Sequence, residues 1–190
     1  QVDIQARGNN ATGVFAENHI PGGHSTNLIT GSEVSITAQT LQTGDTYGMY
    51  SNAGLNQVTA DTQVSVSADN KGTGTAWGMY ANSDSSTTAA GNNEITGQDI
   101  TVAATAAKGD AYAMYASSDE KSTAGNILHL EGGTANISAA SNSATGGYSA
   151  HAMQANDAPD GHNSITGSGT VNIAATSTAK TAIGMSAAAG

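Results

Sequence analysis

Residues 48–68 read GMYSNAGLNQVTADTQVSVSA, and this stretch contains three short patterns that recur along the chain of 190 residues. The first is Gly-Met-Tyr-Ser, the second is an Asn two positions before an aliphatic residue, and the third alternates Val and Ser before a final Ala. Each is short and rich in β-branched or aromatic residues, with Gly, Asn, Ser or Asp between them. Such segments favour β-strands joined by turns.

The first pattern, called segment a, returns at intervals of 30 to 39 residues, a period typical of solenoids and other repeat proteins. Each copy has a small residue followed by Val or Met, and in four copies an aromatic residue comes next. The copies are Gly13-Val14-Phe15-Ala16, Gly48-Met49-Tyr50-Ser51, Gly78-Met79-Tyr80-Ala81, Ala113-Met114-Tyr115-Ala116, Ala152-Met153-Gln154-Ala155 and Gly184-Met185-Ser186-Ala187.

The second and third patterns, called segments b and c, follow segment a in the same order in successive repeats. Segment c alternates apolar and small polar residues, as in residues 64–68, and this period of two is the signature of a half-buried strand. The conserved order of the three patterns supports one continuous repeat architecture. The Asn residues that mark segment b are Asn27, Asn56, Asn93, Asn126 and Asn163.

These repeats predict an all-β fold, a single-chain parallel β-helix (β-solenoid) in which each segment stacks on its equivalent about 4.8 Å away in the next turn. We expect about five turns of 30–39 residues, with three short strands per turn. Residues 1–190 then form a single β-solenoid domain, which is either a fragment of a longer solenoid or a filament subunit. Leu, Ile, Val and Phe make up only 25 residues, so hydrogen bonding between turns must support a modest apolar core.

Alternation in segment a separates an inner and an outer face. We expect Val14 and the Met residues to point inward, where flexible Met side chains fill irregular gaps. The same alternation puts the residue two positions before Met, such as Tyr47, on the inner side near a corner, although a bend at the intervening Gly or Ala would reverse this assignment. The outer face then carries an exposed aromatic ladder, our candidate binding surface, made of Phe15, Tyr50, Tyr80 and Tyr115.

The Asn residues of segment b are candidates for a structural ladder. One Asn amide stacked above another can hydrogen-bond from turn to turn and to the backbone of a tight bend. Sugar binding is the functional alternative for these side chains. The residues assigned to the ladder are Asn27, Asn93, Asn126 and Asn163.

Charge and composition limit the partners. A net charge of −10 argues against nucleic-acid binding and against an anionic lipid surface, because both require clustered Lys and Arg. No segment is long and apolar enough for a transmembrane helix, so we expect no membrane insertion by this segment. The absence of Cys excludes disulfides and thiolate metal sites. Abundant small polar residues favour an extracellular or bacterial cell-surface location.

The sequence contains no recognisable catalytic motif. We find no nucleophile elbow, no phosphate-binding loop with its Lys, and no His-Glu-x-x-His zinc motif. We therefore predict a chain that is not an enzyme and that uses no cofactor and no metal. Asp84, Asp119 and Asp157 occupy similar places after segment a, and stacked carboxylates can ligate Ca²⁺. A solvated acidic edge is the simpler interpretation of these three residues.

The Gly-Met-Tyr-Ala, Asn-x-Ile-Thr-Gly and Val-x-Ile-x-Ala repeats resemble the passenger domains of bacterial autotransporters and related surface adhesins. The resemblance covers nearly the whole chain and rests on structural repeats. It implies a secreted, noncatalytic β-solenoid, adhesive or scaffolding, that is attached to the outer membrane by another domain. Its partners would be host or bacterial surface proteins or glycans. Passengers share a fold rather than a site, so the resemblance assigns no functional residues.

Two other functions remain open at this point. The chain begins with a segment c at residues 2–6 and ends just after a segment a at Met185, without a capping element. Open solenoid ends favour head-to-tail stacking, so the chain could be a self-assembling subunit of an extracellular filament whose partners are copies of itself. The third alternative is a polysaccharide-degrading β-helix enzyme, for which the basic residues are few and no carboxylate pair is fixed by spacing.

Overall fold

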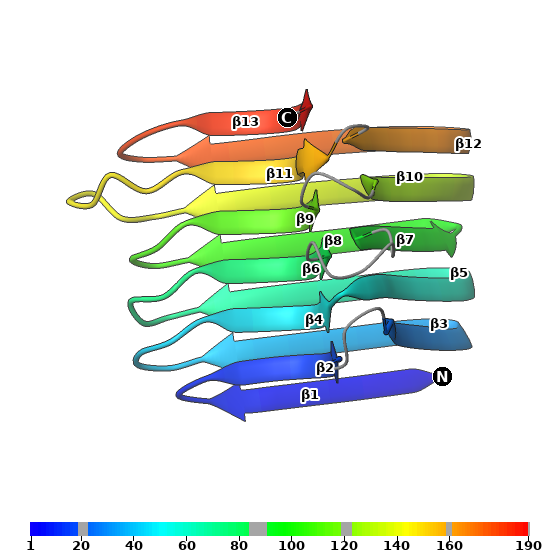
Figure 1. Ribbon diagram of the computed structural model, residues 1–190, viewed down its shortest axis with the longest axis horizontal. Helices are drawn as coiled ribbons and strands as arrows, with labels where there is room; N and C mark the ends of the chain where they lie inside the picture. Colours follow the sequence, from blue (N-terminus) through cyan, green and yellow to red (C-terminus); the bar gives the residue numbers. More distant parts are fainter. Residues whose placement is uncertain (19–22, 84–90, 119–122, 159–160, 190) are drawn as a thin grey trace.

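The computed structural model describes residues 1–18, 23–83, 91–118, 123–158 and 161–189, and within these ranges it contains strands and no helix. The strands form two parallel sheets that rise together along one axis, from β1 at one end of the stack to β13 at the other (Figure 1). The predicted β-solenoid of about five turns is confirmed.

Sheet A contains segments b and c. Its strands follow the order β1-β3-β5-β7-β10-β12, and β8 pairs with β5 and β10. All of these pairs are parallel, and the register aligns equivalent repeat positions, for example Val34 with Val64 and Val64 with Ile100. The strands are β1 (Val2–Gly8), β3 (Ser25–Thr40), β5 (Gly54–Asn70), β7 (Gly91–Gly97), β8 (Asp99–Ala106), β10 (Ala124–Ser141) and β12 (His162–Ser177).

Sheet B contains segment a, and its strands lie in the order β13-β11-β9-β6-β4-β2. Their register places the successive Met residues directly over one another, as in the pairs Met49–Met79 and Met79–Met114. The strands are β2 (Ala11–Glu17), β4 (Thr46–Asn52), β6 (Ala76–Ser83), β9 (Ala111–Ser118), β11 (Ala150–Ala158) and β13 (Ala182–Ala189).

Segments b and c are joined more closely than the sequence suggests. They run together as one bent strand in β3, β5, β10 and β12, and only β7 and β8 are separate. The bend coincides with register shifts, one of which lies between Glu131 and Thr134. Gly132 and Gly133 there have φ angles of 98° and 66°, a conformation that favours glycine. A bulge therefore turns this corner without a loop.

The core lies between the two sheets. Met49, Met79, Met114 and Met153 are fully buried, as predicted, and they pack with the alternating aliphatic residues of segment c. Met185 differs, because it is 43% exposed on the last strand of sheet B, which is paired on one side only. The core therefore depends on turns above and below as well as on the facing sheet.

The prediction that the residue two positions before Met lies on the inner side is wrong, because the strand does not alternate strictly there. In β4 both Gly48 and Met49 are buried, while Tyr47 and Tyr50 are both only partly buried. The parallel pairing passes from Tyr47 directly to Met49, so Gly48 is an irregularity at which the strand changes phase. A Cβ on Gly48 would lie 2.5 Å from the Gly78 carbonyl oxygen and 2.8 Å from Val66 Cγ1, so this inward position accepts only very small residues.

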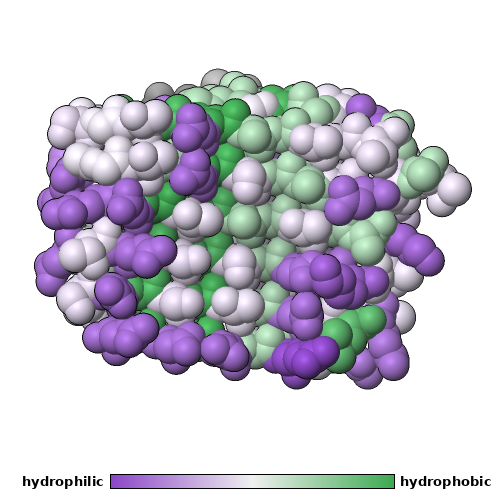
Figure 2. All heavy atoms as spheres, turned by 180° about the vertical axis from the view of Figure 1, so that it is seen from behind, coloured by the Kyte–Doolittle hydropathy of each residue, from purple (hydrophilic) through white to green (hydrophobic). Residues whose placement is uncertain are grey.

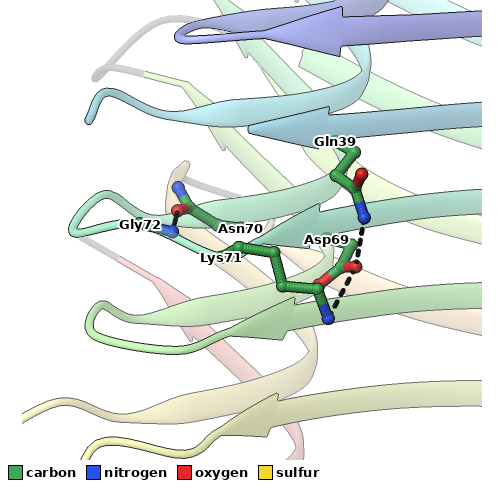
Figure 3. Close-up of polar contacts among 5 residues, drawn as sticks. All are labelled: Gln39, Asp69, Asn70, Lys71 and Gly72. Atoms are coloured by element: carbon green, nitrogen blue, oxygen red, sulfur yellow. Dashed lines mark hydrogen bonds and ion pairs between the residues drawn. The ribbon is translucent and has the colours of Figure 1, made fainter. Parts of the chain in front are cut away.

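The turns from sheet A to sheet B form a polar margin. In the turn after β5, the Asp69 carboxylate lies 2.9 Å from Lys71 Nζ and accepts a hydrogen bond of 3.0 Å from Gln39 Nε2 (Figure 3). Asn70 Oδ1 accepts a hydrogen bond of 2.9 Å from the Gly72 amide. The contacts of Lys71 and Gly72 hold this turn of the chain together, and the bond between Gln39 and Asp69 joins it to the neighbouring turn of the solenoid.

Candidate functional site

The predicted aromatic ladder forms a continuous column on the outer face of sheet B. The rings of Phe15, Tyr50, Tyr80 and Tyr115 stack in order, with centroid distances of 5.1, 5.3 and 5.3 Å and interplanar angles of 8°, 1° and 7°. This spacing follows from the strand separation, because each ring is attached one turn above the previous one. The structure thus brings all four predicted residues together.

A second column lies beside the first and contains the residues two positions before Met, which were expected on the inner side. Tyr47 stacks on Trp77 at 6.2 Å, Trp77 on Tyr112 at 4.3 Å, and Tyr112 on the His151 imidazole at 5.1 Å. The Gly or Ala before each Met is the sequence signal for the outward position of this column. The phase change at that small residue turns positions three apart, such as Tyr47 and Tyr50, to the same face.

The two columns interlock edge to face. Trp77 meets Tyr80 of its own turn at 4.9 Å and Tyr115 of the next turn at 5.1 Å, with interplanar angles of 76° and 70°. Tyr47 makes the same two kinds of contact with Tyr50 and Tyr80, at 5.0 and 5.9 Å. The result is a herringbone arrangement, which we call the aromatic array and define as Phe15, Tyr47, Tyr50, Trp77, Tyr80, Tyr112 and Tyr115.

Stacking within the columns determines which parts of the rings a partner can contact. Ring faces inside each column are covered by the neighbouring rings, so the array offers ring edges and Tyr hydroxyl groups over most of its length. Phe15 ends the first column and is 56% exposed. A surface of edges and hydroxyls supports both apolar contact and hydrogen bonding, the combination for which Tyr is enriched at protein interfaces.

The surroundings of Tyr47, Tyr80 and Tyr112 disfavour the charged form of their hydroxyl groups. Burial, with a smaller contribution from Tyr115, raises the pKa of Tyr80 to about 12. Burial and then the charge of Asp110 raise the pKa of Tyr112 to about 12. Burial and the neighbouring Asp45 also raise the pKa of Tyr47, whose hydroxyl donates to Asp45 Oδ2 over 3.3 Å.

The second column has no Tyr or Trp at either end. At the C-terminal end His151 and then Ile183 continue the column after Tyr112, as the strand register shows. At the N-terminal end Thr12 pairs in register with Tyr47, so among the described residues no ring stacks on that face of Tyr47. An open depression of about 460 Å³ lies at this end, lined by Asn10, Thr12, Gly44, Asp45 and Tyr47.

The Asn residues of segment b form an internal column at the corner between β-segments a and b. Asn27 donates through Nδ2 to Asn56 Oδ1, and the same bond repeats from Asn56 to Asn93, Asn93 to Asn126 and Asn126 to Asn163, over 2.8–2.9 Å. Asn56 therefore joins the four residues assigned from the sequence. Asn56, Asn93 and Asn126 are fully buried, which keeps their amides away from any external sugar.

The Asn column is bonded directly to the strands that carry the aromatic array. Asn27, Asn56 and Asn93 donate to the backbone carbonyl groups of Tyr50, Tyr80 and Tyr115, over 2.7, 2.8 and 2.7 Å. Each bond ties an inner corner to the strand residue whose ring points outward. The column thus positions the aromatic rings through their backbone.

The remaining sequence candidates add no further site. Asp84 and Asp119 lie outside the described residues, as does the side chain of Asp157, so their relation to Ca²⁺ stays a prediction. Within the described ranges, no three His, Asp or Glu side chains come together in a way that could hold a metal ion. The described part of the chain also has no helix long and apolar enough to cross a membrane.

The aromatic array is confined to one side of the molecule. Its stacked rings all belong to strands of sheet B. On the side seen in Figure 2, hydrophilic residues gather along the left, right and lower edges, and neutral to strongly hydrophobic residues lie between them. Comparison with models of protein families, with curated proteins and with solved structures finds no match to this chain.

Proposed function

We propose that this chain is a noncatalytic extracellular β-solenoid module, similar in role to the passenger domains it resembles, which binds a surface protein through the aromatic array. The observation that carries this proposal is the outward position of seven aromatic rings on one rigid face. The rings of the array lie outside the core, where a partner can reach their edges.

The geometry favours a protein partner over a stacked glycan. Sugar recognition by stacking needs open ring faces, whereas most faces in the array are covered by the next ring. Ring edges and Tyr hydroxyl groups suit the mixed apolar and polar surface of a protein. The rings are also held in place before binding, so little side-chain entropy is lost when a partner docks.

Replacement of Tyr50, Tyr80 and Tyr115 by Ala tests this proposal. We expect at least a tenfold loss of adhesion to cells or of binding to the isolated partner, because aromatic residues dominate binding energy at interfaces. The matched control changes Ser35, Ser65 and Thr101 to Ala, a similar column on the outer side of sheet A. Thermal unfolding checks that both variants remain folded. Adhesion that survives in the Tyr variant, or that is blocked by free glycans alone, would overturn the proposal.

Self-assembly into an extracellular filament is a second candidate, supported by the C-terminal end of the solenoid. Val171 and Met185 occupy positions that are buried in the middle turns, yet they are 36% and 43% exposed. A second copy stacked on β12 and β13 would cover them, and so would further turns in a longer chain. Sedimentation of the 190-residue chain over a range of concentrations tests the filament. A strictly monomeric species at high concentration would rule it out.

A further inference from the structure

The second column of the aromatic array has a vacant ring position at its N-terminal end. Thr12 occupies the place that Tyr47, Trp77 and Tyr112 fill in the next three turns, as the strand register shows. Tyr47 has Trp77 on one side of its ring, and on the other side it faces the small Thr12 side chain. One aromatic face is therefore available in an array whose other faces are mostly covered.

The repeat shows what a planar group in this position would touch. Tyr47 and Trp77 each stack on the next ring of their own column and meet two rings of the first column edge to face. A planar group above Thr12 would therefore stack on Tyr47 and lie against Phe15 and Tyr50. The 56% exposure of Phe15 agrees with the absence of such a neighbour.

The depression at this position combines the Tyr47 ring with polar side chains that can accept hydrogen bonds. Asp45 contributes a carboxylate, which already accepts the Thr75 amide over 2.8 Å and the Tyr47 hydroxyl over 3.3 Å. Asn10 and Thr12 add an amide and a hydroxyl. Among the described residues no basic side chain is paired with Asp45, since Lys71 is engaged by Asp69. The carboxylate therefore keeps free lone pairs and an uncompensated charge.

We propose that this notch, formed by Thr12, Asp45 and Tyr47 with Asn10 at its rim, binds a guanidinium group. A guanidinium is planar and cationic, stacks on aromatic rings, and carries five N–H donors, so it matches the open ring face, the acceptors and the carboxylate together. The net charge of −10 further favours a cation. A lysine ammonium has the charge but not the planar shape, and a planar neutral group has the shape but not the charge.

This inference rests on the proposed function, because it takes the aromatic array as the contact surface and names an arginine side chain of the partner protein as one anchor. An arginine is the common protein source of a guanidinium and is enriched at the centres of interfaces. The notch lies at one end of the array, so the same partner could contact the ring edges and place its arginine against Tyr47.

Small probes test the site without the partner. Methylguanidinium, methylurea and methylammonium are titrated into the intact 190-residue chain, with the ring proton signals of Phe15 as readout, since this is the only Phe in the sequence. We expect saturable shifts with methylguanidinium at a Kd on the order of a few millimolar. Methylurea and methylammonium should bind at least about fivefold more weakly. Equal shifts with all three probes, or none with methylguanidinium, would overturn the proposal.

A matched pair of charge variants locates the site. Asp45→Asn should weaken methylguanidinium binding about tenfold, because a charged hydrogen-bond acceptor is lost. Asp110 stands two positions before Tyr112, as Asp45 stands before Tyr47, and it accepts the Ser149 amide over 2.6 Å. The face of Tyr112 toward the first turn is covered by Trp77, so Asp110→Asn should change the Kd by less than about twofold. Equal effects of the two variants would contradict a local site.

Filling the vacancy is the second test. Thr12→Tyr should complete the column and abolish methylguanidinium binding, because its ring would cover the open face of Tyr47. Should Thr12→Tyr fail to fold, Tyr47→Leu removes the stacking face and should abolish binding as well. Binding that persists in the folded Thr12→Tyr variant and in Tyr47→Leu would overturn the site.

The two proposals fail in distinguishable ways. If methylguanidinium binds as expected but adhesion is unchanged by loss of Tyr50, Tyr80 and Tyr115, the proposed function is wrong and the guanidinium site stands. If adhesion depends on those rings but Phe15 does not respond to methylguanidinium, the site is wrong and the proposed function stands.

Discussion

The Asn column and the aromatic array are both repeated once per turn, yet the Asn column lies inside the solenoid on strands of sheet A and the array lies outside it on strands of sheet B. The polar Asn side chains are buried, while the more apolar Tyr and Trp rings lie outside. Hydrogen bonding explains the inversion, because each buried Asn finds amide and carbonyl partners in the adjacent turns. The comparison teaches that partner availability, more than polarity alone, decides which repeated residue is structural and which is free for contact.

The two regions are also coupled. The carbonyl groups that accept the Asn hydrogen bonds belong to Tyr50, Tyr80 and Tyr115, whose rings form the outer column. An inner polar column therefore fixes the backbone from which the outer column projects. This arrangement lets the contact surface stay rigid while its ring edges remain accessible.

The largest expected effect comes from breaking the inner column at its centre. Asn93 donates to Asn126 Oδ1 and to the Tyr115 carbonyl, over 2.9 and 2.7 Å, and accepts from Asn56 over 2.9 Å. Asn93→Ala leaves these buried partners without their bonds, so we expect a loss of about 3 kcal/mol in the free energy of unfolding. Urea denaturation followed by far-UV circular dichroism measures the loss.

An exposed Asn pair provides the control for this prediction. Asn172 Nδ2 donates to Asn136 Oδ1 over 3.0 Å on the outer side of sheet A, where water can replace the bond. Asn172→Ala should therefore change the free energy of unfolding by less than about 0.5 kcal/mol. Similar losses in the two variants would mean that burial does not distinguish the two columns.

The fold and four of the seven residues of the aromatic array could be predicted from the sequence. Spacing alone identified the repeat, and the alternation of Val64 and Val66 with Ser fixed which side of segment c is buried. The outward position of Tyr47 could not be obtained in this way, because it depends on a phase change at Gly48. The continuity of β3 and β5 through segments b and c also depends on local bulge geometry that the sequence pattern does not specify.

A smaller effect is expected from opening the outer array. Tyr80 stacks between Tyr50 and Tyr115 and meets Tyr47 and Trp77 edge to face. Because each aromatic contact contributes about 0.5–1.5 kcal/mol but the ring is partly solvated, Tyr80→Ala should cost about 2 kcal/mol of unfolding free energy. Tyr80→Phe keeps the ring and should cost less than half as much. A Tyr80→Ala loss larger than that of Asn93→Ala would reverse the ranking of the two regions.

The smallest expected effect concerns the transition from the aromatic column to polar residues at His151. Its imidazole stacks on Tyr112, and its Nδ1 atom is buried without a hydrogen-bond partner. Burial lowers the pKa of His151 below its ordinary value of 6.5, although the nearby charge of Asp110 opposes this shift. The folded chain therefore holds a neutral imidazole over a pH range in which the unfolded chain is already protonated.

The direction of the pH effect follows from proton linkage. A lowered pKa in the folded state means that the stability due to neutral His151 is fully present above pH 6.5 and is lost as the pH falls through the folded-state value. Urea midpoints should thus be lower at about pH 5 than at about pH 7.5, and by less than Tyr80→Ala lowers them. His151→Phe keeps a ring on Tyr112 and should reduce this pH dependence. The control is His129→Phe, which removes another imidazole; His129 Nδ1 lies 3.0 Å from Thr166 Oγ1 on an exposed surface. A pH dependence that is unchanged in His151→Phe but absent in a His129→Phe variant would contradict its assignment to the end of the aromatic column.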